Sequence, residues 1–282
     1  MRFPGHFALL VLLLVAGAVQ ARPSGPAALL SDAIGDHDVV LLGEMHGTRE
    51  IPAITARLLT HYASTGPVLL ALEANAADQA GVERFLDSAG AVLDKARLLA
   101  GEHWQEQTHD GRDSVAMFEL LDHARRLRAA GARVSVVMFD VAGSGERDLR
   151  MANAIRAAVQ QHPDARVLVL TGNVHAMTGD PPDMFSAEGE AIELPTPMGR
   201  HLSDLEPLSI VFRASAGDYW ACQKTCGVQQ VNGIAGATDQ PRLSHSDDGD
   251  SWDMELLLPR FTASPPAVGR SPGSNPGDND SR

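Results

Sequence analysis

Aromatic residues are scarce in this sequence, since Phe, Trp and Tyr make up only 5% of its 282 residues. A broad aromatic platform for stacking bases is therefore not expected. Basic residues are also outnumbered by acidic ones, and the formal net charge is -13. Binding to nucleic acid needs a basic face, so this charge argues against it and against anionic membrane surfaces. Cationic ligands and metal ions remain compatible with an acidic chain.

Cysteine is nearly absent as well, and the two that occur, Cys222 and Cys226, lie four positions apart in WACQKTCG. This spacing excludes a CxxC redox motif. A two-thiolate metal site would need further Cys or His ligands nearby, and the segment offers none. In an oxidising compartment, the pair is expected to form a local disulfide.

Long hydrophobic runs are missing beyond the N-terminus. Arg2 precedes an apolar stretch from Phe7 to Ala18, well short of the roughly 20 residues that span a bilayer. Val19 and Ala21 are small residues at the two positions that a signal peptidase reads before cleavage after Ala21, so we expect a signal peptide over 1–21 rather than a membrane anchor. No Cys follows the apolar stretch, so a lipoprotein anchor is not indicated. The expected product is an exported chain of 261 residues with net charge -14, periplasmic or secreted and not inserted in a membrane.

Short apolar runs alternate with amphipathic patterns along most of the chain. We expect strands over 38–42, 67–72, 133–139, 165–170 and 208–213, and helices over 52–62, 76–87, 114–130 and 146–161. This alternation predicts an α/β fold with a mostly parallel sheet flanked by helices. The C-terminal portion is less regular, with a short strand near 253–257 that could run antiparallel. One domain is expected over 22–262, and the Pro-, Gly-, Ser- and Asp-rich residues 263–282 are expected to form a disordered tail.

Polar residues gather where four of the predicted strands end. The carboxyl ends of parallel strands lie on one edge of a sheet, where ligand crevices form, so these side chains are expected to converge on one polar site. The glycines at two of these strand ends suit a sharp turn and a close approach to a ligand. The residues concerned are Gly43, Glu44 and His46 after the first strand, Glu73 after the second, Asp140 after the third, and Gly172, Asn173 and His175 after the fourth.

Two chemistries suit the expected core of this site, which consists of Glu44, His46, Glu73 and His175. Their nitrogen and oxygen atoms are the ligand types that zinc or manganese accepts, with an open position for water. Without a metal, a His oriented by one carboxylate can activate water as a general base while the second His stabilises or protonates the leaving group. Gly43, Gly172, Asn173 and Asp140 are expected to line the bound ligand or cofactor.

Two further sequence features concern a serine nucleophile and a segment that could cover the site. The sequence contains no G-x-S-x-G nucleophile elbow, so a serine nucleophile is not indicated. The irregular GEHWQEQTHD segment carries His103, Trp104 and His109, and a polar connection of this kind could form a lid over the site.

The segments GEMH, LALEAN and GNVH resemble the paired GxxH motifs and intervening glutamate of the haem-binding uptake and Tiki superfamily, which includes ChaN-like, TraB-like and Tiki proteins. The similarity runs approximately from Asp38 to Ala176, and AADQAGVERFLDS and RDLRMANAIRAA also look ChaN-like. More distantly, GEMHGTRE is similar to a segment of erythromycin-esterase-like proteins, although it is one residue shorter here.

The resemblance implies an α/β fold with Gly43, Glu44, His46, Glu73, Gly172 and His175 as functional positions. Members of the superfamily include haem or iron binders and hydrolases, so the resemblance leaves two functions open. The first is a ChaN-like protein that binds haem, iron or another metal ion at the two GxxH motifs. The second is a hydrolase, metal-dependent or based on His and Glu, that acts on an ester or an amide. In both cases the expected partner is a small molecule or haem.

Overall fold

The computed structural model describes residues 25–105, 110–179, 184–185, 191–192, 194–223, 225–231, 238–246 and 251–269. The expected signal peptide over 1–21 lies outside these residues. Within the described residues, no helix is both long enough and apolar enough to cross a bilayer.

The described residues form a seven-stranded sheet with the order β10-β11-β7-β1-β4-β2-β3. Every neighbouring pair is parallel except β10 and β11. The strands are β1 (Val39–Glu44), β2 (Val68–Asn75), β3 (Val134–Asp140), β4 (Arg166–Gly172), β7 (Leu208–Ala214), β10 (Arg242–His245) and β11 (Met254–Leu258). The predicted α/β fold with a mostly parallel sheet is confirmed.

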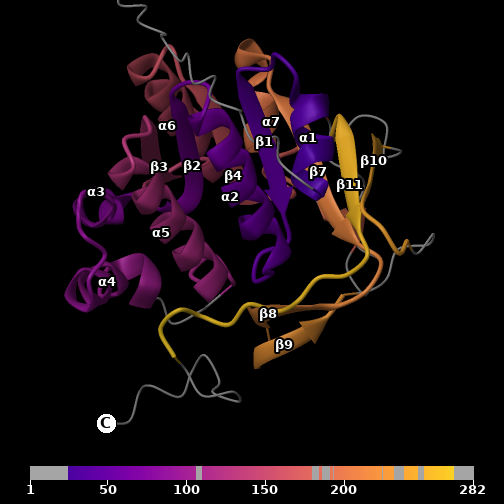
Figure 1. Ribbon diagram of the computed structural model, residues 1–282. Helices are drawn as coiled ribbons and strands as arrows, with labels where there is room; N and C mark the ends of the chain where they lie inside the picture. Colours follow the sequence, from indigo (N-terminus) through magenta and orange to yellow (C-terminus); the bar gives the residue numbers. More distant parts are fainter. Residues whose placement is uncertain are drawn as a thin grey trace, which may run out of the picture.

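Helices cover both faces of the sheet and make three layers (Figure 1). One face is covered by α1 (Pro26–Ile34), α2 (Glu50–Ala63), α3 (Gln79–Leu86), α4 (Val92–Leu99) and α5 (Val115–Ala129). The other face is covered by α6 (Arg147–Gln161) and the short α7 (Met198–His201). Short 3₁₀ turns lie at Ala76–Asp78, Glu102–Gln105 and Ser203–Leu205, and a two-stranded ribbon joins β5 (Met184–Phe185) to β6 (Ala191–Ile192).

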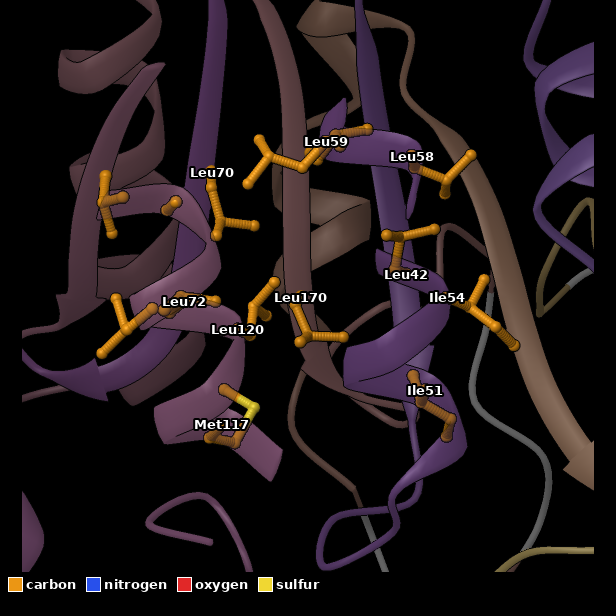
Figure 2. Packing of buried hydrophobic residues seen from close by; sticks show 14 of the residues in the cluster. Leu42, Ile51, Ile54, Leu58, Leu59, Leu70, Leu72, Met117, Leu120 and Leu170 are labelled. Atoms are coloured by element: carbon orange, nitrogen blue, oxygen red, sulfur yellow. The ribbon is translucent and has the colours of Figure 1, made fainter. Parts of the chain in front are cut away.

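The central strands β1, β2 and β4 are largely apolar because both of their faces are buried. In β1, Val40 and Leu42 pack toward α2, whereas Val39 and Leu41 pack toward the α6 face. Figure 2 shows Leu42 close to the α2 side chains Ile54 and Leu58. Full burial of one such side chain stabilises the fold by about 1.5–3 kcal/mol. This core fixes the strands whose ends carry the polar residues.

Local signals set the boundaries of α5. The Ser114 side chain accepts a hydrogen bond from the Met117 N–H and caps the first turn. At the other end, the chain leaves the helix through Gly131, whose φ of 88° suits glycine. The predicted helix over 114–130 is therefore correct to within one residue at each end.

Several parts of the fold differ from the sequence predictions. The helices α1 and α4 were not predicted, because each is short and carries few buried residues. The strand expected near 253–257 is β11, which runs parallel to β7 and antiparallel only to β10. Residues 263–269, which we expected to begin a disordered tail, pack on the domain, and residues 270–282 lie outside the described part of the chain.

The segment from Phe261 to Ala267 runs along the carboxyl edge of the sheet as the yellow trace below it in Figure 1. The Ser264 N–H donates to the Gly47 carbonyl at 2.8 Å, and the Ala267 N–H donates to the Asp113 carbonyl at 2.9 Å. These bonds tie the turn after β1 to the segment before α5. The Pro- and Gly-rich composition predicted disorder here, but the apolar and hydroxyl residues of the segment make contacts with the domain.

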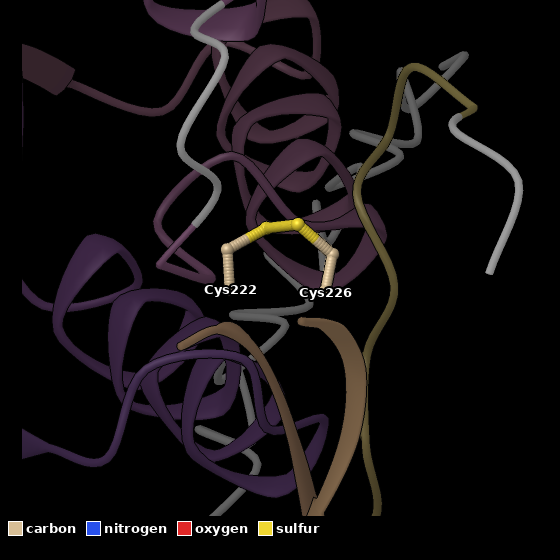
Figure 3. The surroundings of a disulfide bond; sticks show 2 residues. All are labelled: Cys222 and Cys226. Carbon is tan, nitrogen blue, oxygen red and sulfur yellow. A yellow bond between two sulfur atoms is a disulfide. The ribbon is translucent and has the colours of Figure 1, made fainter. Parts of the chain in front are cut away.

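A disulfide joins Cys222 to Cys226, as predicted (Figure 3). It closes the hairpin of β8 (Asp218–Cys222) and β9 (Cys226–Gln230). The hairpin also contacts the turn after β1, because the Trp220 N–H donates to the Gly47 carbonyl at 3.0 Å. The turn that carries His46 is thus held by two separate parts of the C-terminal portion.

Candidate functional site

The structure brings the polar ends of four neighbouring strands together. Glu44 is the last residue of β1, Asp140 the last of β3 and Gly172 the last of β4, while Glu73 lies near the end of β2. Glu44 is directly paired with Gly172 across β1 and β4. Parallel pairing thus brings these strand ends together, as expected from the sequence.

His46 lies on the turn after β1, where Glu44 orients its ring. Nδ1 of His46 lies 3.1 Å from Oε1 of Glu44. The other ring nitrogen, Nε2, is 3.8 Å from Oε2 of Glu73, beyond hydrogen-bonding distance. The side chain is 20% exposed, so Nε2 can meet a ligand. The turn needs Gly47, whose φ is 72° and where a β-carbon would lie 2.0 Å from the Trp220 carbonyl oxygen.

The charge of His46 follows from its neighbours. Burial lowers its pKa, but the carboxylates of Glu44, Glu73 and Asp110 outweigh that effect and raise the pKa to about 9. At neutral pH the imidazole is therefore mainly protonated, and its Nδ1–H donates to Glu44.

Glu73 is a buried carboxylate, with a side chain only 3% exposed, that is fully satisfied. Its Oε2 accepts hydrogen bonds from the Thr171 hydroxyl and the Gly172 N–H, both at 2.7 Å. Its Oε1 accepts from Arg147 Nη2 at 2.8 Å and from Arg112 Nη1 at 3.3 Å. Burial alone would raise its pKa, but protonated His46 and the two arginines hold it well below its usual range. Glu73 is therefore ionised and a weak base.

Asp140 joins the same network from β3. Its carboxylate accepts from Arg147 Nε at 3.1 Å, from Arg147 Nη2 at 2.7 Å and from Arg112 Nη1 at 3.0 Å. Despite partial burial, these two guanidinium groups lower the pKa of Asp140. The same carboxylates raise the pKa of both arginines, so all four groups stay charged.

His175 follows β4 and is bonded through both ring nitrogens. Its Nε2 lies 2.8 Å from Arg147 Nη1, and its Nδ1 lies 2.7 Å from Oδ1 of Asp148. A guanidinium can only donate, so Nε2 accepts and Nδ1 carries the proton that is donated to Asp148. His175 therefore differs from His46, because both of its ring nitrogens already have protein partners.

The glycines expected at the site, Gly43 and Gly172, leave room for neighbouring side chains. A β-carbon at Gly172 would lie 3.0 Å from His46 Nε2, and one at Gly43 would lie 3.0 Å from the Ala176 β-carbon. Both distances are tighter than ordinary van der Waals contact, so a side chain at either position would push its neighbour back by a few tenths of an ångström. Asn173 is placed differently, since its side-chain oxygen accepts from the Val174 N–H and its carbonyl accepts from the Trp252 indole. Its side chain caps its own turn, and its N–H donates to the Glu44 carbonyl at 3.0 Å.

Sequence reasoning missed the three residues that complete the network, Arg112, Arg147 and Asp148. Arg112 comes from the irregular segment before α5, and the other two begin α6. The only sequence signal was the position of Arg147 and Asp148 at the start of a helix that follows the third strand.

The lid expected over the site is not formed by the residues that the structure describes there. Trp104 is buried in the core and packs edge-on against Phe118. His103 is also buried, and its Nε2 is 3.1 Å from the carbonyl oxygen of Arg112. These two residues support the backbone that carries Arg112, and His109 lies outside the described residues.

The residues do not fit a resident metal ion. Among the described residues, no group of three or more His, Cys, Asp or Glu side chains is arranged to hold one. His175 Nε2 and Glu73 Oε1 already accept hydrogen bonds from Arg147. A metal at His46 would have to displace the proton that a pKa of about 9 keeps on the ring at neutral pH. A cation at these atoms would also face two guanidinium groups. Two of the four donors that the sequence suggested, Glu73 and His175, are hydrogen-bonded to arginine.

The fold belongs to a class of α/β proteins known from solved structures. It is similar to a histidine-to-asparagine mutant of the erythromycin esterase EreC in its open conformation, with a TM-score of 0.64 and 13% identity over 86% of this chain and 95% of that chain. A protein from Bacillus cereus has a TM-score of 0.56 and 12% identity over 88% of this chain and 97% of that one. A succinoglycan biosynthesis protein has a TM-score of 0.56 and 10% identity over 87% of this chain and 95% of that one.

These likenesses show a shared fold and, at such low identities, nothing more specific. No protein-family model matches the sequence. No curated protein sequence matches it either. The function must therefore be argued from the site.

Proposed function

We propose that this protein is a hydrolase that needs no metal and uses His46 to activate water for attack on an ester or amide. The observation that carries the proposal is the setting of His46. Glu44 holds one ring nitrogen, and the other, Nε2, lies 3.8 Å from Glu73 Oε2, beyond hydrogen-bonding distance. A histidine oriented by a carboxylate in this way is suited to general base catalysis.

His46 is the best base among the described groups of the site. Glu73 is held ionised by arginines and accepts protons poorly. The Nε2 atom of His175 already accepts a hydrogen bond from Arg147. Only His46 combines an open ring nitrogen with a pKa high enough to take a proton from water during attack.

The reaction follows from this arrangement. Neutral His46 removes a proton from a water molecule through Nε2 while the water oxygen bonds to the carbonyl carbon. The imidazolium then returns the proton to the leaving oxygen or nitrogen as the bond from that atom to carbon breaks. The positive charge that forms on His46 is stabilised by Glu44 and Glu73. Because the pKa of His46 is about 9, only about 1% of it is neutral at pH 7, so hydrolysis should be fastest at alkaline pH.

An ester is the favoured substrate class because the fold resembles that of an erythromycin esterase and because GEMHGTRE is similar to a segment of such proteins. Haem or iron binding, which the ChaN resemblance implies, remains a separate prediction. It would use His46 or His175 as a ligand, and the hydrogen bond from Arg147 to Nε2 counts against that use of His175.

The test is hydrolysis of a panel of nitrophenyl esters and amides by chelator-treated protein. The His46→Gln variant should lose about a hundredfold or more of the rate, whereas a matched change of the exposed His37→Gln should keep it. Equal rates in wild type and His46→Gln would refute the proposal. Activity that disappears with chelator and returns with zinc or manganese would establish metal dependence instead. A Soret band on adding haem, lost in His46→Gln or His175→Gln, would support the haem prediction.

A further inference from the structure

Asp148 is a buried carboxylate, 3% exposed, that lies one residue after Arg147 at the start of α6. Its Oδ1 accepts from the ring of His175 and also from the Met198 N–H, each at 2.7 Å. It therefore connects three elements: α6, the turn after β4 and the first residue of α7.

The main chain of His175 is fixed by the same part of the fold. Its carbonyl accepts from the Gly199 N–H at 2.8 Å. A β-carbon at Gly199 would lie 2.6 Å from the Met177 carbonyl oxygen, so α7 can approach this turn only with glycine there. The backbone of His175 is held by α7 and its ring by Asp148, which leaves the ring one orientation.

The ring in turn holds Arg147. Neighbouring residues on a helix point about 100° apart, so Arg147 and Asp148 leave α6 in different directions, and His175 bridges them. The Arg147 guanidinium then donates to Asp140 and Glu73 at 2.7 and 2.8 Å. A continuous path of hydrogen bonds thus runs from Asp148 through His175 and Arg147 to Glu73, the carboxylate beside His46.

We propose that Asp148 is a positioning residue of the active site, which acts through His175 to hold Arg147 against Glu73 and Asp140. This inference rests on the proposed hydrolase function. It gives His175 a role different from that of His46: it is a neutral bridge with its proton on Nδ1, rather than a base or a metal ligand. The ring of His175 is held by the oxygen of Asp148 that accepts its hydrogen bond, and the negative charge of Asp148 is less important for this role.

Two variants of Asp148 separate the need for a hydrogen-bond acceptor from the need for a negative charge. Asp148→Asn keeps an oxygen that both His175 and Met198 can donate to, whereas Asp148→Ala removes it. Asp122→Ala is the matched control, because Asp122 is a buried carboxylate on α5 that pairs with Arg125 away from the site. The first measurement is the nitrogen-15 NMR spectrum of the His175 ring, which reports its tautomer independently of any activity.

We expect the Nδ1-protonated signal in wild type, Asp148→Asn and Asp122→Ala, and its loss in Asp148→Ala. The kcat for ester hydrolysis should fall about tenfold to a hundredfold in Asp148→Ala, with little change in KM and near wild-type kcat in Asp148→Asn. An unchanged His175 signal in Asp148→Ala, or equal losses of kcat in both variants, would overturn the inference. If Asp148→Ala does not fold, Asp148→Asn decides alone: a retained signal supports the inference and a lost one refutes it. Absence of hydrolysis by wild type would count against the proposed function only, because the NMR comparison still tests the positioning.

Discussion

Replacing Glu44 by Gln should lower the pKa of His46 by a large and measurable amount. The pKa is raised from 6.5 to about 9, and this difference corresponds to about 3 kcal/mol in favour of the protonated ring. Glu44 makes the largest favourable contribution, through its charge and its hydrogen bond. Its side chain is 2% exposed, so water screens the interaction little. Gln keeps the shape but loses the charge, and we expect the pKa to fall by about 1 unit or more.

The assay is an NMR titration of the His46 ring protons in wild type and Glu44→Gln, from about pH 5 to about pH 11. A matched Glu50→Gln variant, changed at the start of α2, should leave the His46 titration where it is in wild type. If the pKa of His46 in Glu44→Gln stays near the wild-type value, the carboxylate does not control the ring and the argument for His46 as an oriented base is wrong. A wild-type pKa close to 6.5 would refute the same reasoning.

Three more predictions follow from the same structure. The folded-state pKa of His46 is raised above 6.5 to about 9, so its contribution to stability is complete below pH 6.5 and is lost as pH rises through 9. Over this pH range, the unfolding free energy measured with denaturant should fall by up to about 3 kcal/mol more in wild type than in His46→Gln. Gly172→Ala puts a β-carbon 3.0 Å from His46 Nε2, so the rate of ester hydrolysis should drop at least about tenfold. Circular dichroism should show an intact fold. An unchanged rate would contradict the close approach of Gly172 to His46. Replacing Cys222 and Cys226 by Ser should lower the unfolding free energy by about 2 kcal/mol, and equal denaturation midpoints would show that the disulfide contributes no stability.

Much of the site could be predicted because parallel strands place their carboxyl ends on one edge. Glu44, Glu73 and Asp140 lie at successive strand ends, and the short turns after β1 and β4 carry His46 and His175 to the same place. Each of these positions follows from the apolar run before it. The catalytic roles of these residues remain predictions, whereas the α/β fold that brings them together is confirmed.

The arginines could not be predicted in the same way. Arg112 and Arg147 have long side chains that reach the site from an irregular segment and from the start of a helix. Where such a side chain ends depends on the packing of the whole edge, and no local pattern specifies it. Their presence changes the chemistry of the site, because they take the lone pairs of Glu73 and His175 that a metal ion would need. Trp104 illustrates the converse, since a polar sequence context concealed a residue that is buried in the core.

The central claim is that His46, without any metal, is the base for hydrolysis. The most direct test is the pH dependence of kcat/KM for a nitrophenyl ester with chelator-treated wild-type protein, from about pH 6 to about pH 10. We predict a rate that rises with pH and levels off near the His46 pKa of about 9. No hydrolysis at any pH, or a rate that does not respond to pH across this range, would contradict the claim.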